Sequence, residues 1–416
     1  MTAPVLNGLD VFAPDRVLVP GNRWDLLPPA PTPSVTVVVT HFEQPASLAR
    51  VLTALAGLDI VVADDGSATP PAVPAGVRLV RQPDLGFRAA AARNLGASVA
   101  TGDVLVFLDA DTVPEPGFVP ALVRRAAASP DVLAVGRRRH ADLSGDGREL
   151  PEPAWLREGL AATADLLHAD GRSFRFVISA VLACRRELFE DLGGFDERYV
   201  GYGGEDWDLA YRAWNNGALL LHERDAVAIH DGPEWADRDG DVSRKDAETA
   251  RLAALIPEPL TRGAALPGLL PDVLVDVASY DVRCVQALLA QSHRDLLVRV
   301  AGAGEVHAGH VRTEPWTVDQ QRRARVRLRL ERPIALAQDV VAQLVRRLTD
   351  GGCGELVLTA DGHPVGTAVS TRALGRARRW PDAHDVAGRC FGRESVEVTV
   401  LAPRSDLAGF LAHLRR

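Results

Sequence analysis

Strand-forming and helix-forming segments alternate along the first half of the chain, and this alternation constrains the fold more than any other feature. A β-branched run at residues 35–40 is followed by a helical pattern that begins at Pro45. Further strands are expected at 60–63, 77–80 and 104–108, with a helix at about 87–100. Regular alternation of this kind predicts a doubly wound α/β fold with a mainly parallel sheet.

The length of 416 residues, or 44.6 kDa, is too great for one domain of common size and predicts at least two. Residues 1–33 contain seven prolines and are expected to be a tail that wraps around the protein or dangles from it. We predict a larger domain over 34–262 and a smaller α/β domain over 263–416.

The C-terminal region is interpreted as a degenerate copy of the first domain. Residues 271–300 repeat the strand–helix–strand order, and Gly354–His363 parallels Gly102–Asp111, which sets Asp361 opposite Asp109. General α/β similarity explains the pattern equally well. The alternating Arg325, Arg327 and Arg329 favour a solvated edge strand over a surface that binds an anionic acceptor.

Composition excludes several classes of protein. The net charge of −8 gives the chain as a whole no electrostatic reason to bind nucleic acid. No apolar run is long enough for an integral membrane segment, and the first residues lack the pattern of a secretory signal. The four cysteines are scattered, without zinc-type spacing, which suits a reducing cytoplasm.

Polar side chains follow three of the expected strands, where ligands of open parallel sheets bind. They are Thr40 with His41, Asp64 with Asp65, and Asp109 with Asp111. Asp109 and Asp111 would repel each other unless a cation or hydrogen-bond donors separated them, so an oxygen-ligated divalent ion with a bound diphosphate is a natural partner. Taken alone, the pair is better explained as a solvated loop.

A second acidic cluster lies downstream, in Gly201-Tyr202-Gly203-Gly204-Glu205-Asp206-Trp207-Asp208. The glycines permit close approach of a ligand, and Glu205 and Asp206 are expected at the start of a helix, where the helix dipole stabilises negative charge. Simple capping by Asp206 explains one acid but neither the glycines nor the aromatic residues. Arg93 is either a surface residue or a nucleotide contact.

In this order, the DDGS, ARN, FLDAD, GGFDE and GYGGEDWDLAYR stretches resemble the family-two glycosyltransferases of GT-A fold. The GGED stretch is similar to that of the β-1,4-galactosyltransferase and chondroitin-polymerase type of domain. The resemblance covers roughly residues 34–235. It implies an enzyme that takes a sugar from a nucleoside-diphosphate sugar, with a UDP-sugar as first choice, and passes it to a hydroxyl of a glycan or small molecule.

The resemblance also implies roles for individual residues. Donor contacts fall on Thr40, Asp64, Asp65, Arg93 and Asp109; metal ligands on Asp111, His230 and Asp109; acceptor contacts on Tyr202 and Trp207; and catalysis on Asp206, as general base, with Glu205. The implied cofactor is Mn²⁺ or Mg²⁺. A satisfied histidine at a strand end is the alternative for His230. The first strand ends in Thr40-His41-Phe42-Glu43, unlike the usual Pro-Thr-Tyr-Asn, which affects the expected base contacts.

These features predict a cytoplasmic, metal-dependent inverting glycosyltransferase. The first alternative is a non-catalytic protein that binds a nucleotide sugar or a glycan, although such a protein has no reason to keep Asp109, Asp111, Asp206 and His230 together. A nucleotidyltransferase would need a glycine-rich basic loop, which residues 40–46 lack. For the C-terminal region we consider support of the catalytic domain, contact with the acceptor, or assembly into a homo-oligomer.

Overall fold

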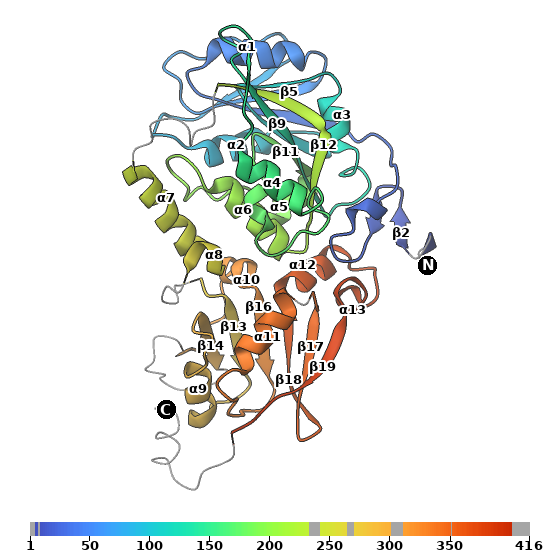
Figure 1. The fold of residues 1–416 in the computed structure, drawn as a ribbon, viewed down its shortest axis with the longest axis vertical. Helices are drawn as coiled ribbons and strands as arrows, with labels where there is room; N and C mark the ends of the chain where they lie inside the picture. The colour runs from blue at the N-terminus through green and yellow to red at the C-terminus, as the bar shows by residue number, and fades with distance from the viewer. Residues whose placement is uncertain are drawn as a thin grey trace. The chain divides into compact units, whose positions relative to one another are not determined.

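The computed structural model describes residues 5–6, 9–232, 242–263, 270–300, 311–350 and 352–401. The chain divides into two compact units (Figure 1). The N-terminal unit comprises Met1–Trp214 and Ala218–Leu252, and the C-terminal unit comprises Asn215–Gly217 and Ala253–Arg416. None of the helices within the described ranges is long and apolar enough to cross a membrane.

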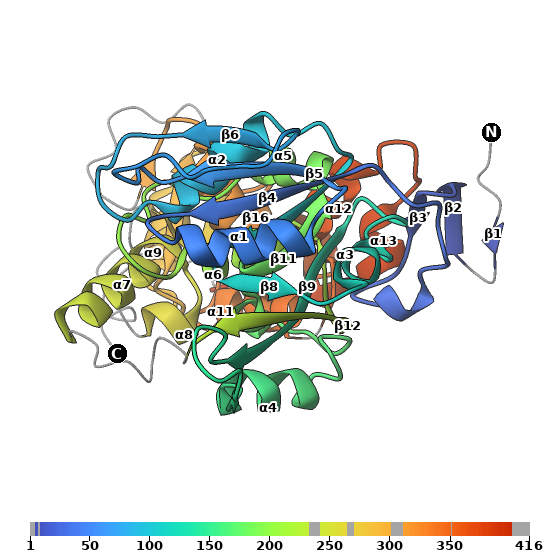
Figure 2. The ribbon, with the colours of Figure 1, turned by 90° about the horizontal axis from the view of Figure 1, so that it is seen from above.

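The N-terminal unit is built around one nine-stranded sheet. Its order is β6-β5-β4-β7-β11-β9-β12-β8, and β10 pairs with β9. The strands are β4 (Val35–His41), β5 (Asp59–Asp64), β6 (Arg78–Arg81), β7 (Val104–Asp109), β8 (Thr112–Pro114), β9 (Val132–Ala141), β10 (Glu149–Leu150), β11 (Val181–Arg185) and β12 (Leu219–Asp231). Strands β4, β5 and β6 lie side by side in Figure 2.

The expected parallel arrangement is uninterrupted in one half of this sheet only. Strands β6, β5, β4 and β7 run parallel, whereas β11 is antiparallel to both β7 and β9. Strand β12 runs parallel to β9, and the short β8 is antiparallel to β12. The sheet is therefore mixed. Strands β4 and β7 lie at its centre, and their apolar side chains between Val37 and Val39 and between Val104 and Leu108 are fully buried.

The helices and 3₁₀ turns of this unit are η1 (Trp24–Leu26), α1 (Pro45–Ala54), α2 (Ala89–Ser98), α3 (Phe118–Val123), α4 (Ala154–Ala162), η2 (Ser173–Phe176), α5 (Arg186–Leu192), α6 (Glu205–Asn215) and α7 (Val242–Leu255). Helix α1 begins at Pro45, where a missing N–H costs nothing, and buries Leu48, Val51 and Leu52. Helix α2 packs on β4 and β5.

The proline-rich N-terminal segment has structure of its own. Strands β1 (Val5–Leu6), β2 (Leu9–Ala13) and β3 (Arg16–Leu18) form a small antiparallel sheet. The amide of Val17 donates to the Ala128 carbonyl at 2.9 Å. The Asn22 amide group donates to the carbonyls of Leu166 and Leu220 at 2.6 and 2.9 Å. The segment wraps onto the unit and does not dangle.

The C-terminal unit carries a seven-stranded mixed sheet of order β15-β14-β13-β16-β18-β17-β19. Its strands are β13 (Val273–Val277), β14 (Leu296–Val300), β15 (Val311–Arg312), β16 (Val326–Leu330), β17 (Glu355–Ala360), β18 (His363–Ser370) and β19 (Arg393–Glu397). Its helices are α8 (Pro259–Arg262), α9 (Val282–Leu289), α10 (Val318–Arg323), α11 (Val340–Thr349), α12 (Thr371–Arg379) and α13 (Val386–Phe391).

The two sheets have the same topology. Strands β13 to β19, taken in chain order, occupy the places of β4, β5, β6, β7, β9, β11 and β12. Each neighbouring pair also has the same parallel or antiparallel sense as its counterpart. The expectation that segments 274–277 and 356–360 share a sheet is met, and the matching order supports a repeated half.

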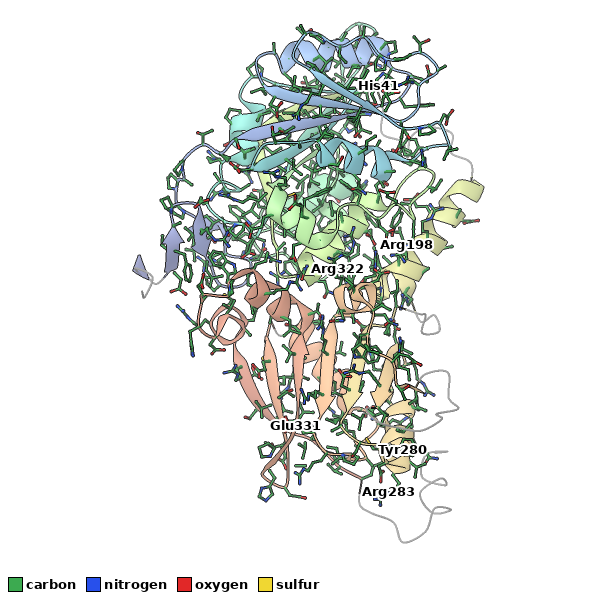
Figure 3. All side chains as sticks on the ribbon, turned by 180° about the vertical axis from the view of Figure 1, so that it is seen from behind. His41, Arg198, Tyr280, Arg283, Arg322 and Glu331 are labelled. Carbon is green, nitrogen blue, oxygen red and sulfur yellow. The ribbon has the colours of Figure 1, made fainter. Side chains whose placement is uncertain are left out.

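The residue-level alignment of the two halves was wrong. Strand β17, which precedes Asp361, takes the place of β9, and β16 takes the place of β7. Val326 pairs with Val273 as Val104 pairs with Val35, so Glu331 corresponds to Asp109 and Pro333 to Asp111. Both β7 and β17 are apolar strands that end near an aspartate, and this shared pattern explains why the sequence comparison paired them incorrectly. Glu331 and Tyr280 lie at one end of this sheet (Figure 3).

The arginine-rich strand β16 is not an edge strand, because it lies between β13 and β18. Just before it, Arg325 forms a two-pronged ion pair with buried Asp272, at 2.6 and 2.7 Å. Burial alone would raise the pKa of Asp272, but Arg325 and, to a smaller extent, His293 together outweigh it and lower this pKa to about 2. Arg327 donates to the side-chain and main-chain oxygens of Gln321 in α10. These two arginines therefore have structural partners.

Helix α2 approaches the sheet so closely that Gly96 has no room for a side chain. A Cβ atom there would lie 2.4 Å from Cγ1 of Val38 and 3.2 Å from Cβ of Ala63. We predict that Gly96→Ala destabilises the protein by about 1–2 kcal/mol, because overpacking outweighs the gain in helix propensity. Urea denaturation measures this, with Ser98→Ala on the exposed side of the helix as control. Equal midpoints for the two variants would contradict the close packing.

Candidate active site

The ends of strands β4, β7 and β12 bring the predicted metal ligands together. Thr40 of β4 pairs with Asp109 of β7, and the chain then turns back so that Thr112 of β8 pairs with His230 of β12. As a result, Nε2 of His230 lies 3.6 Å from Oδ2 of Asp111. Nδ1 of His230 faces the Gly232 carbonyl at 3.2 Å, which leaves Nε2 directed towards the carboxylate.

The environment of Asp111 favours a positive charge. Burial raises the pKa of its carboxyl group, and the neighbouring charge of Asp109 raises it further. His230 and Arg138 act in the opposite direction. A bound cation would stabilise the ionised form of both aspartates. The part of the chain that the structure describes contains no group of three His, Cys, Asp or Glu residues arranged to hold a metal alone.

Arg93 lies at the centre of the site and is almost completely buried. Its guanidinium group donates to Oδ1 of Asp109 at 2.8 Å and to Oε1 of Glu205 at 2.9 Å. Burial lowers the pKa of Arg93, but the charges of the two carboxylates outweigh this and raise it. The side chain is therefore an internal link between β7 and α6, and its predicted contact with the nucleotide stays a prediction.

Asp206 stands in the first turn of α6, behind the glycine-rich loop. Its Oδ1 accepts a hydrogen bond from the amide of Trp207 at 2.8 Å. Burial and then the charge of Glu205 raise the pKa of Asp206 to about 7, against smaller opposing effects that include Arg93. In the loop, Gly204 has φ +92°, and a Cβ atom there would lie 2.7 Å from the Tyr199 ring.

The Asp64–Asp65 pair is held by protein groups. Asp64 is fully buried and interacts with Nδ1 of His41 at 2.8 Å, the Ser67 hydroxyl at 2.6 Å and Nε of Arg81 at 2.8 Å. Burial raises the pKa of Asp64, but these hydrogen bonds together lower it. Asp65 accepts from the amide of Arg88 at 2.7 Å. Asp64 thus stabilises the loop that follows β5 and does not project from it. Its partner His41 is labelled in Figure 3.

The remaining predicted contacts surround this centre. The Thr40 hydroxyl is buried and has no hydrogen-bond partner within the described ranges, as expected of a group whose partner is a bound ligand. Tyr202 is 42% exposed, and its ring lies 5.6 Å from that of Phe87. Trp207 packs edge-on against Phe174 at 6.1 Å. Tyr202 is therefore accessible, whereas Trp207 is partly covered.

Sequence reasoning missed the contribution of β9. The ring of His140 packs 4.9 Å from that of His230, and Arg138 lowers the pKa of both Asp111 and Asp206. The only signal was the run Arg137–His140, in which alternate residues face the site. Asp231 also binds the neighbouring loop through the amides of Leu143 and Ser144.

Comparison with known proteins finds a family that resembles part of this unit. Residues 36–193 match the family model described as Glycosyl transferase family 2. This match agrees with the predicted resemblance, and the mixed α/β sheet of the N-terminal unit is a GT-A-like fold. The repeated sheet adds a second α/β unit.

Two relatives illustrate the similarity. The chain is 32% identical over 208 residues to the pre-mycofactocin glycosyltransferase of Mycobacterium tuberculosis, covering 47% of this chain and 42% of that protein. It is 25% identical over 321 residues to the chondroitin synthase of Escherichia coli, covering 65% of this chain and 46% of that protein. The chain thus spans less than half of the length of either relative.

A solved structure also resembles part of the chain. This is a mannosyltransferase from Pyrobaculum calidifontis in complex with GDP-Man and Mn²⁺. It is 21% identical, with a TM-score of 0.39, and the match covers 56% of this chain and 66% of the solved one.

The raised pKa of Asp206 predicts a pH-dependent effect on stability. An acid whose pKa rises from 3.8 to about 7 on folding favours the folded state at low pH and loses this contribution as the pH increases through 7. Asp206→Asn, which cannot ionise, should therefore raise Tm relative to wild type, and the increase should be clearly larger at pH 8 than at pH 5, where part of the contribution is still present. Asp339→Asn, at an exposed site, is the control. An equal Tm difference at both pH values would show that Asp206 has an ordinary pKa.

Proposed function

We propose that the chain is an inverting glycosyltransferase that moves a sugar from a nucleoside-diphosphate sugar, with a UDP-sugar as first choice, to the hydroxyl of a glycan or small molecule. One observation carries the proposal. At one edge of the sheet, Asp111 and His230 approach to 3.6 Å, while Arg93 ties Asp109 to the helix turn that bears Asp206. The proposed binding site for a metal ion and a diphosphate is thereby connected, through Arg93, to the proposed general base.

Asp111 and His230 fit a divalent cation, either Mn²⁺ or Mg²⁺. A carboxylate oxygen and an imidazole nitrogen face each other, and the pKa of Asp111 is raised by burial and by Asp109 in a way that a cation would reverse. Two protein ligands leave coordination positions for diphosphate oxygens. A metal bound there would neutralise charge on the leaving nucleoside diphosphate. Asp109, whose carboxylate accepts a hydrogen bond from Arg93, would support these two ligands from a neighbouring position.

Asp206 is the proposed general base. A pKa of about 7 makes its carboxylate basic enough to accept a proton from an acceptor hydroxyl, and much of it is ionised at neutral pH. The hydroxyl oxygen then attacks the anomeric carbon on the face opposite the nucleotide, and configuration is inverted. Glu205 does not share this role: its ion pair with Arg93 fixes the start of α6 and so positions Asp206.

The donor and acceptor are assigned to opposite sides of this centre. The buried hydroxyl of Thr40, which has no hydrogen-bond partner within the described ranges, supports a contact with the nucleoside. Asp65 and Arg93 are the other proposed contacts of the donor nucleotide. Exposed Tyr202, in the loop whose GGED stretch is similar to that of galactosyltransferase-type domains, is proposed to pack against the acceptor, with Trp207 behind it.

The first test of this proposal concerns the base. Asp206→Asn is expected to lower kcat by about 10²–10⁴-fold, the usual cost of losing general-base catalysis, while nucleotide affinity changes little. Nucleotide release from UDP-, GDP- and dTDP-sugars gives the rate, and calorimetry gives the affinity. Glu197→Gln, an acid on the neighbouring surface, is the matched control. A kcat within a few-fold of wild type would remove Asp206 from the role.

The second test concerns the metal. Asp111→Ala and His230→Ala should each weaken Mn²⁺-dependent binding of the free nucleoside diphosphate by at least about tenfold, because ion and diphosphate are expected to bind as one unit. Calorimetry with and without excess chelator measures this, and Asp339→Ala is the control. Nucleotide binding that is indifferent to chelator in the wild type would contradict both assignments.

The same measurements separate the enzyme from a non-catalytic binding protein. A binding protein would take up the nucleotide sugar in a metal-dependent way without releasing nucleotide, and Asp206→Asn would change nothing. Turnover that is lost in Asp206→Asn, with binding preserved, is the expected result for the transferase.

A further inference from the structure

The N-terminal unit contains a pocket beside the catalytic centre that the proposed mechanism does not use. It is a cavity of about 230 Å³ between helix α4, residues 176–178 and strands β9 and β12, which we call the α4 pocket. One end is at Arg138, two residues along β9 from His140, whose ring packs on His230. The other end is at His222, which pairs with Val135, roughly 16 Å from His230 at the ~3.3 Å rise of a strand.

The floor of the α4 pocket is apolar and partly aromatic. Leu156 and Leu160 of α4 face Phe176 and Ile178 across it. The structure makes room for this ring, because a Cβ atom on Gly159 would lie 2.0 Å from Cε1 of Phe176. Trp155, 44% exposed, extends the aromatic surface, with its ring 6.4 Å from Phe176 and inclined by 24°. The Arg175 guanidinium group lies over the Phe176 ring, 4.7 Å from its centroid, so the C–H face of a sugar ring would contact the apolar surface that this group leaves open.

The polar groups of the pocket carry an excess of positive charge. The lining contains four arginines, Arg137, Arg138, Arg157 and Arg224, and two acids, Glu152 and Asp165. Glu152 pairs with Arg137 at 2.6 Å, and Asp165 pairs with Arg224. Arg157 has only a loose contact of 3.5 Å with Glu158 on its own helix, and its side chain is 59% exposed. An anionic ligand would therefore meet available positive charge here.

His222 supplies an acceptor at the far end. Its side chain is 6% exposed, and Nδ1 lies 2.8 Å from Oδ1 of Asp165. Because the carboxylate can only accept, Nδ1 carries the proton and Nε2 presents a lone pair. Nε2 is buried without a hydrogen-bond partner in the described ranges, and His222 lines the pocket. A ligand hydroxyl is the simplest donor for it.

The chain holds this dyad at a conformational cost. Ala164, Asp165 and Leu166 are three consecutive non-glycine residues with φ of 49°, 57° and 68°, a region that such residues rarely adopt. The turn is kept by the bond from the His222 amide to the Asp165 carbonyl at 3.1 Å and by Asn22, which donates to the Leu166 carbonyl. Strain retained in this way indicates a functional constraint.

We propose that the α4 pocket binds the acceptor through an acidic sugar residue, with its ring on the Phe176–Ile178 surface, a hydroxyl on Nε2 of His222 and its carboxylate facing Arg157. This inference deepens the proposed function and rests on it, because Arg138 of the pocket lies two residues along β9 from His140, whose ring packs on His230 of the candidate active site. The apolar floor, the accessible guanidinium group of Arg157 and the buried acceptor of His222 together match a uronic acid, whereas a neutral sugar would make no ionic contact with Arg157.

The test compares two probes that differ only in the predicted feature, 4-nitrophenyl β-D-glucuronide and 4-nitrophenyl β-D-glucoside. Calorimetric titration of the full chain should show about tenfold tighter binding of the glucuronide, as expected for a hydrogen bond to a charged group. Arg157→Gln should reduce this preference to less than about threefold, while Arg346→Gln, which removes an exposed arginine of α11, should leave it intact. Equal binding of the two glycosides to the wild type would overturn the proposal.

A second variant examines the dyad. In His222→Asn the amide nitrogen can still donate to Asp165, but the acceptor at the Nε2 position is lost. Both glycosides should then bind about fivefold more weakly, with the preference for the glucuronide retained. Unchanged binding in this variant would remove His222 from the site.

Nucleotide release without added acceptor separates this inference from the proposed function. Turnover of a nucleotide sugar together with equal binding of the two glycosides would overturn the acidic-sugar site and leave the transferase standing. A clear preference for the glucuronide, with no donor turned over, would support the site and overturn the transferase.

Discussion

Arg93 holds together three parts of the site that the chain brings from distant positions. It belongs to α2, and its two ion pairs reach Asp109 at the end of β7 and Glu205 at the start of α6. A buried guanidinium group with one partner removed is costly, by about 3–5 kcal/mol, so the three elements are fixed as a set. The steric fit of Gly96 against β4 places α2 at the depth that this link requires.

The same arrangement sets the chemistry of the acids. Glu205 pairs with Arg93, and burial together with the charge of Glu205 raises the pKa of Asp206 to about 7. Asp111, on the other side of Asp109, also has a raised pKa and faces His230. Four carboxylates and one arginine thus provide, for the proposed reaction, one acid suited to take up a proton and another suited to a cation.

The two sheets show what is general in this fold and what is specific to the site. Their strand order and direction agree, so the topology alone cannot carry catalysis. Where the first unit has Asp109 and Asp111, the second has Glu331 and Pro333, and proline offers no ligand. The C-terminal unit therefore keeps the layered core without the acidic pair of the N-terminal unit.

Much of the parallel half of the fold could be predicted from sequence, because its buried strands are continuous β-branched runs and its helices have clear apolar faces. The approximate positions of α2 and α6 followed from the same patterns. The antiparallel β8 and β11 were not predicted, since short strands give little periodic signal. The structured N-terminal segment was missed because proline content indicates the absence of long elements and says nothing about packing.

The candidate site was predicted in part for a similar reason. Residues at strand ends can be located from sequence, and Asp109, Asp111 and His230 do lie together at the end of the sheet where β7 and β12 finish. Arg93 is paired with two acids, and Asp64 is hydrogen-bonded to His41, Ser67 and Arg81. These side-chain contacts join segments that are remote in the sequence, so they could not be predicted from it. The Asp165–His222 dyad depends on a left-handed turn at three ordinary residues, which no local pattern indicates.

The connection between β9 and β11 differs most between the two halves. In the N-terminal unit it runs through residues 142–180 and contains α4 and η2, whereas its counterpart between β17 and β18 is the two-residue turn Asp361–Gly362. One wall of the α4 pocket is therefore a segment that has no counterpart in the second half. Such a segment can be exchanged or remodelled while the strand ends stay unchanged, so that under the proposed function the preference for an acceptor can change while the proposed catalytic residues are kept.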